Sequence, residues 1–389
     1  PVHREITVLP TVDIRELAKQ KSFGMNSTAP AELRPINPPA GLPEGTRKGV
    51  TINEAAPKEK GWETFWSKRG DKSIIASIPS PATTRTFKSD HLTIGFIPPD
   101  TMGAVGPNHV VTTTNEKVVI HDRNGVVLST VTLNAFWAGT GGIAPLNAFD
   151  PKILYDRFND RFIFVVVANA QNPTSATLLA VSQTGDPAGT WNRYAIDADA
   201  TATAGGGTWA DFPSVGFNMN WITISINRFG FGSVSGFQGP SIYVVPKAPA
   251  YANTLGAVSV FEASFFSGCL SLPAASQPQA LGCGFTYSPA LTEDNTTNDH
   301  YITEDWDSGA GQLRMSRVTG TALSPILEVG YQFPQSPYAW RFNASLISGT
   351  GGYVPQRQQN VYAPSGTRPA ASSTQRRVEL TPAPPGRRP

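Results

Sequence analysis

The chain is poor in charge: Asp, Glu, Lys and Arg make up 15% of its 389 residues, and the formal net charge is only +2. Binding to nucleic acid depends on a clustered basic face, so this composition gives no case for a nucleic-acid partner. The longest apolar run, Phe162 to Ala168, is far shorter than the roughly 20 residues of a membrane-spanning helix. We therefore expect no nucleic-acid partner and no membrane span.

Short catalytic motifs are also missing. The sequence has no GxSxG elbow, no HExxH, no P-loop and no dinucleotide fingerprint. Its five histidines are dispersed along the chain, at His3, His91, His109, His121 and His300. Function must therefore be inferred from how the chain is organised.

Cysteine is scarce, and both copies, Cys269 and Cys283, lie in one irregular loop. An even number inside one loop predicts a local disulfide, which would stabilise the fold by roughly 3 kcal/mol on the chain-entropy model. The alternative is two buried free thiols, since no metal-type spacing accompanies them.

Glycine and proline are abundant, with 36 and 34 copies, so turns and short strands are favoured over long helices. The stretch Phe149 to Asn169 has the alternation, polar turn and β-branched second arm of a β-hairpin. Similar hairpins start near Pro98, Asp211 and Ser288. One supersecondary unit repeated four times predicts a β-propeller.

A second hairpin follows each of these four units and completes a four-stranded blade. The strongest turn signal is the Asn-Gly pair within Lys117 to Leu133. The other outer pairs are Ala176 to Ile196, Ser241 to Ala263 and Gly311 to Phe333. We predict an all-β, propeller-like fold of four blades, with the termini as candidates for an irregular fifth. A β-sandwich or irregular barrel is the alternative.

The chain divides into three parts by composition. Residues 1–91 predict a pro-segment or a strap along the blades, with a short helix in Asp13 to Gln20 and an aromatic packing patch at Trp62, Phe65 and Trp66. Residues 92–353 form the propeller-like domain. Residues 354–389 are rich in Arg and Pro, which is typical of a disordered tail or of a shifted reading frame. The uncharged surface and the start at Pro1 rather than Met predict a secreted or cell-surface protein whose targeting segment has been removed.

Several segments resemble a known group of proteins: GAVGPNHVVTTTN, FDPKILYDRFNDRF, LLAVSQTGDPAGTWNRYAI and WADFPSVGF. They are similar to segments of secreted bacterial proteins, largely uncharacterised, that are considered β-propeller-like and are often joined to sorting or Ig-like modules. The resemblance covers about Pro98 to Val260 well, the fourth repeat faintly and the first 90 residues not at all. It implies the fold and secretion, but no reaction and no catalytic residues. Such proteins continue with further blades where this chain changes character after Val354, which leaves ring closure open.

Polar residues recur where each inner hairpin begins and ends. In a propeller, these two positions open on the same face, around the central channel. We therefore expect a common mouth lined at the strand entrances by Asp100, Asp150 and Asp211, and at the second-strand exits by Asn115, Asn169, Asn227 and the Glu304-Asp305 pair. The fourth repeat adds unrepeated side chains near a Gly-rich turn, His300, Trp306 and Arg314, as further ligand-binding candidates.

Three uses of this mouth are open. Asp100, Asp150 and Asp211 have the oxygen ligands that Ca²⁺ prefers. Two carboxyls among Asp150, Asp211, Glu304 and Asp305 could serve a glycoside hydrolase as acid and as base or nucleophile. The same residue types also close turns by accepting backbone N–H bonds, which is a purely structural role.

We therefore predict a secreted propeller that recognises a polysaccharide or cell-surface glycan, with a structural Ca²⁺. The competing hypotheses are a glycoside hydrolase and a scaffold module without a small ligand.

Overall fold

The computed structural model describes residues 1–19, 87, 89, 99–138, 147–265, 280–292, 294, 296–307 and 312–332. The predicted aromatic patch, the predicted tail and Cys269 lie outside the described residues. Cys283 is buried and is not a free thiol, but the disulfide with Cys269 stays a prediction.

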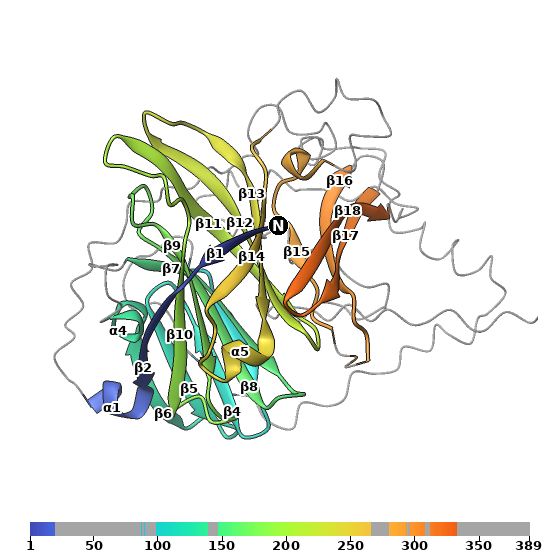
Figure 1. The fold of residues 1–389 in the computed structure, drawn as a ribbon. Helices are drawn as coiled ribbons and strands as arrows, with labels where there is room; N and C mark the ends of the chain where they lie inside the picture. The colour runs from blue at the N-terminus through green and yellow to red at the C-terminus, as the bar shows by residue number, and fades with distance from the viewer. Residues whose placement is uncertain are drawn as a thin grey trace, which may run out of the picture.

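The all-β prediction is confirmed, and each repeat forms one antiparallel sheet whose strands follow in chain order (Figure 1). The first sheet contains β3 (Met102–Val105), β4 (His109–Thr113), β5 (Lys117–Asp122) and β6 (Val127–Thr132). The second contains β7 (Ala148–Asp156), β8 (Arg161–Ala168), β9 (Ala176–Ser182) and β10 (Thr190–Asp197). The third contains β11 (Gly206–Phe217), β12 (Trp221–Gly232), β13 (Phe237–Pro246) and β14 (Ala257–Glu262). The fourth contains β15 (Ser288–Pro289), β16 (His300–Asp307), β17 (Gln312–Thr321) and β18 (Ser324–Gln332).

Short helices occupy some of the connections: α4 (Leu133–Trp137) follows β6, and α5 (Lys247–Tyr251) follows β13. A 3₁₀ turn, η4 (Leu281–Cys283), precedes the fourth sheet. No helix in the described part of the chain has the length and apolar character needed to cross a membrane.

The sheets pack against one another in chain order through three apolar layers. Strand β8 shows why, because its side chains alternate between two of these layers. Ile163, Val165 and Val167 pack toward the third sheet, whereas Phe162 and Phe164 pack toward the first. A third layer, around Trp221, Ile242 and Ile302, joins the third and fourth sheets.

The contacts between successive sheets run through their innermost strands: β3 lies against β7, β7 against β11, and β11 against β15. Such contacts are typical of sheets arranged radially around a shared inner edge. Within the described residues, no contact of comparable extent joins β15 back to β3, so the four sheets form an open arc.

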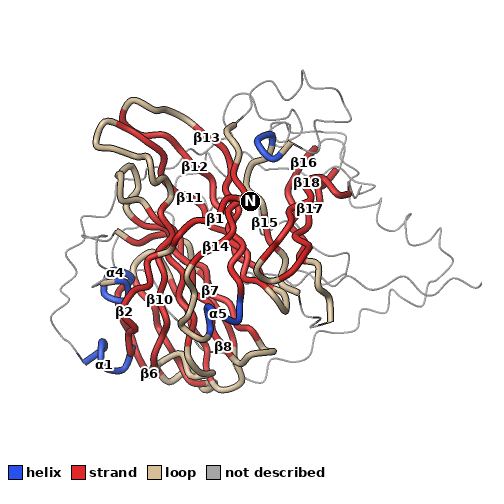
Figure 2. The backbone as a smooth tube through the Cα atoms, in the orientation of Figure 1, coloured by secondary structure: helices blue, strands red, loops and turns tan. Residues whose placement is uncertain are grey.

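The N-terminal segment adds outer strands to two of the sheets. β1 (Val2–Glu5) pairs with β14, and β2 (Thr7–Asp13) pairs with β10, so the third and second sheets each have five strands. Helix α1 (Ile14–Lys19) follows, where a short helix was expected, and lies beside β6. Figure 2 shows this segment running across the outside of the sheets.

Candidate functional site

Two of the four innermost strands, β7 and β11, contain a bulge. The register of β7 shifts between Phe149 and Lys152, and that of β11 shifts between Asp211 and Ser214. The extra residue of each bulge has a left-handed backbone, with φ of 54° at Asp150 and 51° at Phe212. Positive φ values also occur just before β3, at Asp100, and just before β15, at Thr286. We call this shared region, at the start of β3, β7 and β15 and in the middle of β11, the bulge end.

The sequence suggested that Asp150 and Asp211 occupy equivalent positions in their strands, but the strand register places them one residue apart. Asp211 pairs with Asn227 across its hairpin, as Phe149 pairs with Val167. Phe212 is therefore the counterpart of Asp150, and Asp211 lies one residue earlier. Treating Asp211 as the equivalent of Asp150 was wrong, because Phe212 stands between Asp211 and Pro213, whereas Asp150 directly precedes Pro151.

Asn115 joins the first sheet to the second at the bulge end. Its Nδ2 donates to Oδ2 of Asp100 at 2.6 Å, and its Oδ1 accepts the backbone N–H of Asp150 at 2.8 Å. All three residues are buried. The side chain of Asn115 is thus held inside the protein by partners from two sheets.

Asn227 makes the same kind of joint between the third and fourth sheets. Its Oδ1 accepts the N–H of Thr286 at 3.0 Å, and its Nδ2 donates to Oγ1 of Thr286 at 2.8 Å. Asn169 instead closes a loop of the second sheet, accepting from the N–H of Asn147 and donating to Oγ1 of Thr174. These three asparagines were predicted to bind ligand, and the structure gives them structural hydrogen bonds.

Asp150, Lys152 and Asp211 form the charged part of the bulge end, and each is at most 3% exposed. Lys152 precedes Leu154 on the face of β7 that packs toward the third sheet, and Asp211 follows Trp209 on the face of β11 that packs toward the second. The Lys152 Nζ lies 5.6 Å from the ring centroid of Phe212, so the two bulges adjoin. None of the three charges is isolated.

The predicted calcium site is not formed as expected. Among the described residues, no group of three or more His, Cys, Asp or Glu side chains is placed to hold a metal ion. Asp100, Asp150 and Asp211 therefore do not converge as one ligand set. The hydrogen bond between Asp100 and Asn115 shows one reason, since it directs that carboxylate into the joint.

In the fourth sheet, Glu304 and Arg314 form an ion pair of 2.8 Å with both side chains 0% exposed. Arg314 also donates to the hydroxyl of Tyr287 and to the carbonyl oxygen of Ala280. Burial alone would lower the pKa of Arg314, but the Glu304 carboxylate and Tyr287 outweigh it, and the pKa is raised. Burial likewise holds the pKa of Tyr287 well above its usual value.

Glu304 was predicted to be catalytic and Arg314 to bind ligand, and the structure pairs the two side chains with each other. The residues face the core between the third and fourth sheets, on the same side of β16 as Ile302. Asp305 and Trp306 follow in β16, but their side chains lie outside the described part, so their roles stay predictions.

His300 lies far from the bulge end, because it pairs with Val318 and is five residues away from Asp305 along β16. The ring is fully buried, with Nδ1 2.8 Å from Oγ1 of Thr223 and Nε2 2.8 Å from the carbonyl oxygen of Ala290. Burial lowers its pKa to about 4. His300 was predicted to bind ligand, and the structure gives its ring structural hydrogen bonds.

A second buried ion pair was not predicted. The Nζ of Lys247 lies 2.7 Å from Oδ2 of Asp156, which also accepts from the hydroxyl of Tyr251 at 2.7 Å. Lys247 donates further to the carbonyl oxygen of Asn218 at 2.6 Å. The pair lies at the end of β7 away from the bulge and fastens α5 to the second sheet. A signal was available, since Lys247 is the sole lysine after Lys152.

Comparison with known proteins gives partial likenesses. No family model and no curated protein sequence matches the chain. Among solved structures, a subtype N11 neuraminidase-like protein of A/flat-faced bat/Peru matches with a TM-score of 0.33 and 10% identity, over 61% of this chain and 58% of that one. The exo-β-1,3-galactanase 1,3Gal43A from Clostridium thermocellum matches with a TM-score of 0.32 and 10% identity, over 66% and 52%. An endo-arabinanase from Bacillus licheniformis matches with a TM-score of 0.31 and 12% identity, over 63% and 77%. The chain thus spans little more than half the length of the first two.

Proposed function

We propose that the protein is a carbohydrate-active, propeller-like protein that binds a polysaccharide at the bulge end and hydrolyses a glycosidic bond there. The observation that supports this most is the placement of two carboxyls, from Asp150 and Asp211, on adjoining bulges of neighbouring sheets. Most glycoside hydrolases use two carboxyl groups, one on each side of the glycosidic bond that they cleave.

The surroundings suggest separate roles for the two carboxyls. Asp211 and Lys152 lie on the faces of β11 and β7 that turn toward each other, and Asp211 is the proposed base or nucleophile. The backbone of Asp150 is fixed by Asn115 from the first sheet, and its carboxyl is the proposed acid that protonates the leaving oxygen. The separation of the two carboxyls would decide whether the anomeric configuration is retained or inverted.

A second candidate is recognition of a glycan without cleavage. It is favoured by the role of Asp100 and Asn115, which are already engaged in joining two sheets. In this case the repeated polar residues shape the bulge end, and the sugar is bound but not hydrolysed. The same proposal includes secretion, closure of the ring by further blades, and membership of the secreted family that the sequence resembles.

The test is a panel of polysaccharides with the wild type, Asp150→Asn and Asp211→Asn. As a hydrolase, the wild type releases reducing ends, and each variant loses activity by on the order of a thousandfold. Asp122→Asn is the matched control, because Asp122 caps the exposed β5–β6 turn. A protein that binds a polysaccharide equally well in all four forms and cleaves none supports recognition instead. A wild type that neither binds nor cleaves any glycan contradicts both candidates.

A further inference from the structure

The N-terminal segment, residues 1–19, is attached to the outside of sheets that are already complete. β10 and β14 are the fourth strands of their meanders, and β1 and β2 pair only with these outer edges. Val2 to Glu5 pair with Val260 to Ala257, and Thr7 to Asp13 pair with Ala195 to Thr190. The segment is therefore an added strand that the meanders do not need for their own strand order. We call residues 1–19 the strap.

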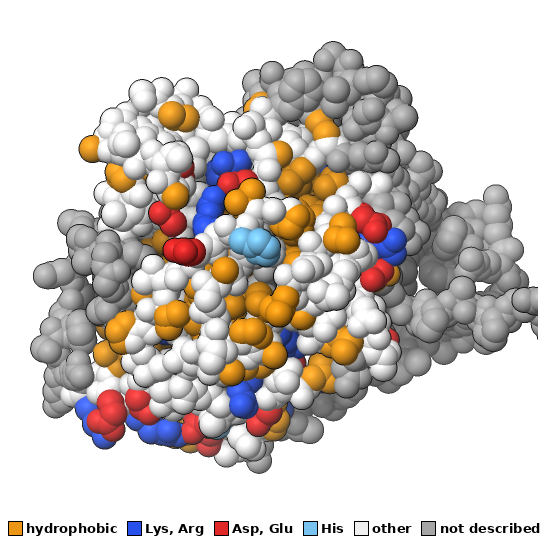
Figure 3. Space-filling model, viewed as in Figure 1, with side chains coloured by type: hydrophobic (Ala, Val, Ile, Leu, Met, Phe, Trp, Pro, Cys, Tyr) orange, Lys and Arg blue, Asp and Glu red, His pale blue; other side chains and the backbone are white. Residues whose placement is uncertain are grey.

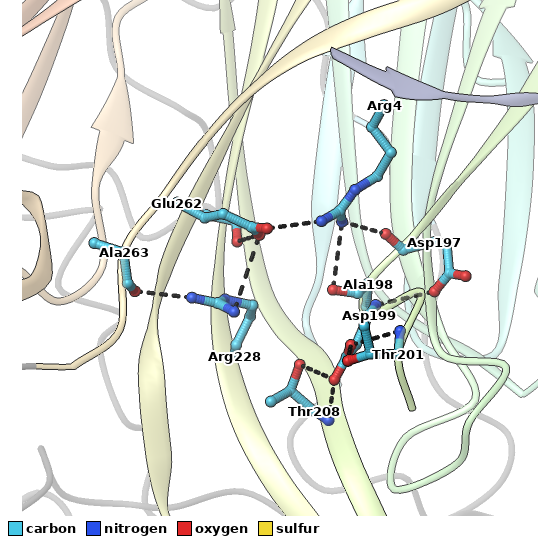
Figure 4. A network of polar contacts seen from close by, with 10 residues as sticks. Arg4, Asp197, Ala198, Asp199, Thr201, Thr208, Arg228, Glu262 and Ala263 are labelled. Atoms are coloured by element: carbon cyan, nitrogen blue, oxygen red, sulfur yellow. Dashed lines mark hydrogen bonds and ion pairs between the residues drawn. The ribbon is translucent and has the colours of Figure 1, made fainter. Parts of the chain in front are cut away.

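Arg4 fastens the strap at the seam between the second and third sheets (Figure 4). Its Nη1 donates to the carbonyl oxygen of Asp197 at 2.7 Å, and its Nη2 donates to Oε1 of Glu262 at 2.7 Å. Arg228 lies on the other side of Glu262, at 3.9 Å, and donates to the carbonyl oxygen of Ala263. The edge thus presents a carboxylate and backbone carbonyls to a cation supplied by the strap.

Apolar side chains of the strap reach the layers between the sheets. Ile6 packs against the layer between the second and third sheets, and Leu9 and Ile14 are buried in the layer between the first and second. Beside them, the guanidinium of Arg193 donates to the carbonyl oxygens of Pro10 and Phe136 at 2.8 and 2.6 Å. The edge therefore contacts the spaced apolar side chains of the strap as well as its cation. Figure 3 shows a group of acidic and basic side chains near the middle of this face, surrounded mainly by uncharged surface.

The partners of the strap lie far along the chain. The ion pair between Arg15 and Asp186 spans 171 residues, and that between Arg4 and Glu262 spans 258. These are non-local contacts, so a strap from another molecule would present the same side chains to the edge as the chain's own strap does.

We propose that the outer edge of β10 and β14 is a docking surface for the strap, and that it accepts this segment from a second copy of the same chain. The recognised features are an extended segment with a cation at position 4 and apolar side chains at positions 6, 9 and 14. Strand addition to an exposed sheet edge is a common mode of peptide recognition, with backbone bonds giving affinity and side chains giving selectivity.

The test uses the full chain with a protease site inserted between residues 20 and 86. Cleavage leaves the original strap held without a covalent link, and an isotope-labelled peptide of residues 1–19 then stands in for the strap of a second copy. Native mass spectrometry should show the labelled peptide replacing the original one at a ratio of one to one. An Arg4→Ala peptide should bind about tenfold more weakly, because it lacks the charged hydrogen bonds to Glu262. A His3→Ala peptide is the control, since His3 is exposed on the same strand.

Two results would overturn the proposal. One is a cleaved protein that keeps its original strap through a day with a hundredfold excess of labelled peptide, or that loses the strap and takes up none. The other is equal binding of the Arg4→Ala and wild-type peptides. Neither result depends on glycan activity, so the two proposals fail separately.

Discussion

Lys247→Met should destabilise the protein strongly, because it removes the cation from a buried ion pair. The Asp156 side chain is 0% exposed and that of Lys247 is 3% exposed. Removing one partner of such a pair costs about 3–5 kcal/mol, since the remaining charge is buried without a counter-ion. Asp156 would still accept hydrogen bonds from Tyr251 and from the N–H groups of Phe158 and Asn159. We therefore expect the lower end of the range, about 3 kcal/mol, which is roughly a hundredfold change in the folding equilibrium.

Urea unfolding measures this cost as a fall in the midpoint at an unchanged m-value. Lys19→Met is the matched control, because the pair of Lys19 with Glu16 is exposed by 70% and 67%. Exposed pairs of this kind contribute about 0–1 kcal/mol. The double variant Lys247→Met with Asp156→Asn should recover part of the loss, since it no longer buries an unpaired charge. Equal destabilisation by Lys247→Met and Lys19→Met would refute the reasoning.

Three further outcomes follow from buried groups. Burial lowers the pKa of His300 to about 4, so the unfolded chain takes up the proton first as the pH falls from 6.5 to 4. The free energy of unfolding should fall by roughly 3 kcal/mol over this window, and His300→Gln should remove that part of the pH dependence; equal slopes would contradict it. Gly284→Ala should cost about 1–3 kcal/mol by calorimetry, because its Cβ would lie within 2.5 Å of polar atoms of Arg314, Tyr287 and Glu304. Gly256→Ala, with nothing within 4 Å, is its control, and equal effects would be the contrary result. Asn115→Leu and Asn227→Leu should each cost about 1–3 kcal/mol in urea unfolding, because each breaks a joint between sheets; wild-type stability in either variant would exclude the joint.

The four-stranded sheets could be predicted from the sequence because each is built from local hairpins. The Asn-Gly turn is one example: Gly125 has φ of 90°, and Asp122 caps the turn by accepting from the N–H groups of Asn124 and Val126. The strands of the strap could not be predicted in the same way, because β1 and β2 pair with residues far along the chain. Pairing of this kind depends on the packed sheets rather than on local pattern.

The candidate site was predicted in part. The sequence pointed to this region of the inner strands, but Asp211 lies one residue before Phe212, the counterpart of Asp150. The cluster of charge in the fourth repeat was a misleading signal, since Glu304 and Arg314 neutralise each other inside the core. Alternation along a strand decides which side chains are buried, and a shift of one residue reverses that assignment.

The central claim is that the carboxyls of Asp150 and Asp211 act together on a glycan at the bulge end. The most direct measurement is release of reducing ends from a panel of polysaccharides, with the wild type, both asparagine variants and Asp122→Asn compared at equal folded concentration. We expect activity in the wild type and in Asp122→Asn, and a loss on the order of a thousandfold in Asp150→Asn and in Asp211→Asn. Full activity in either of the two asparagine variants at the bulge end would contradict the claim.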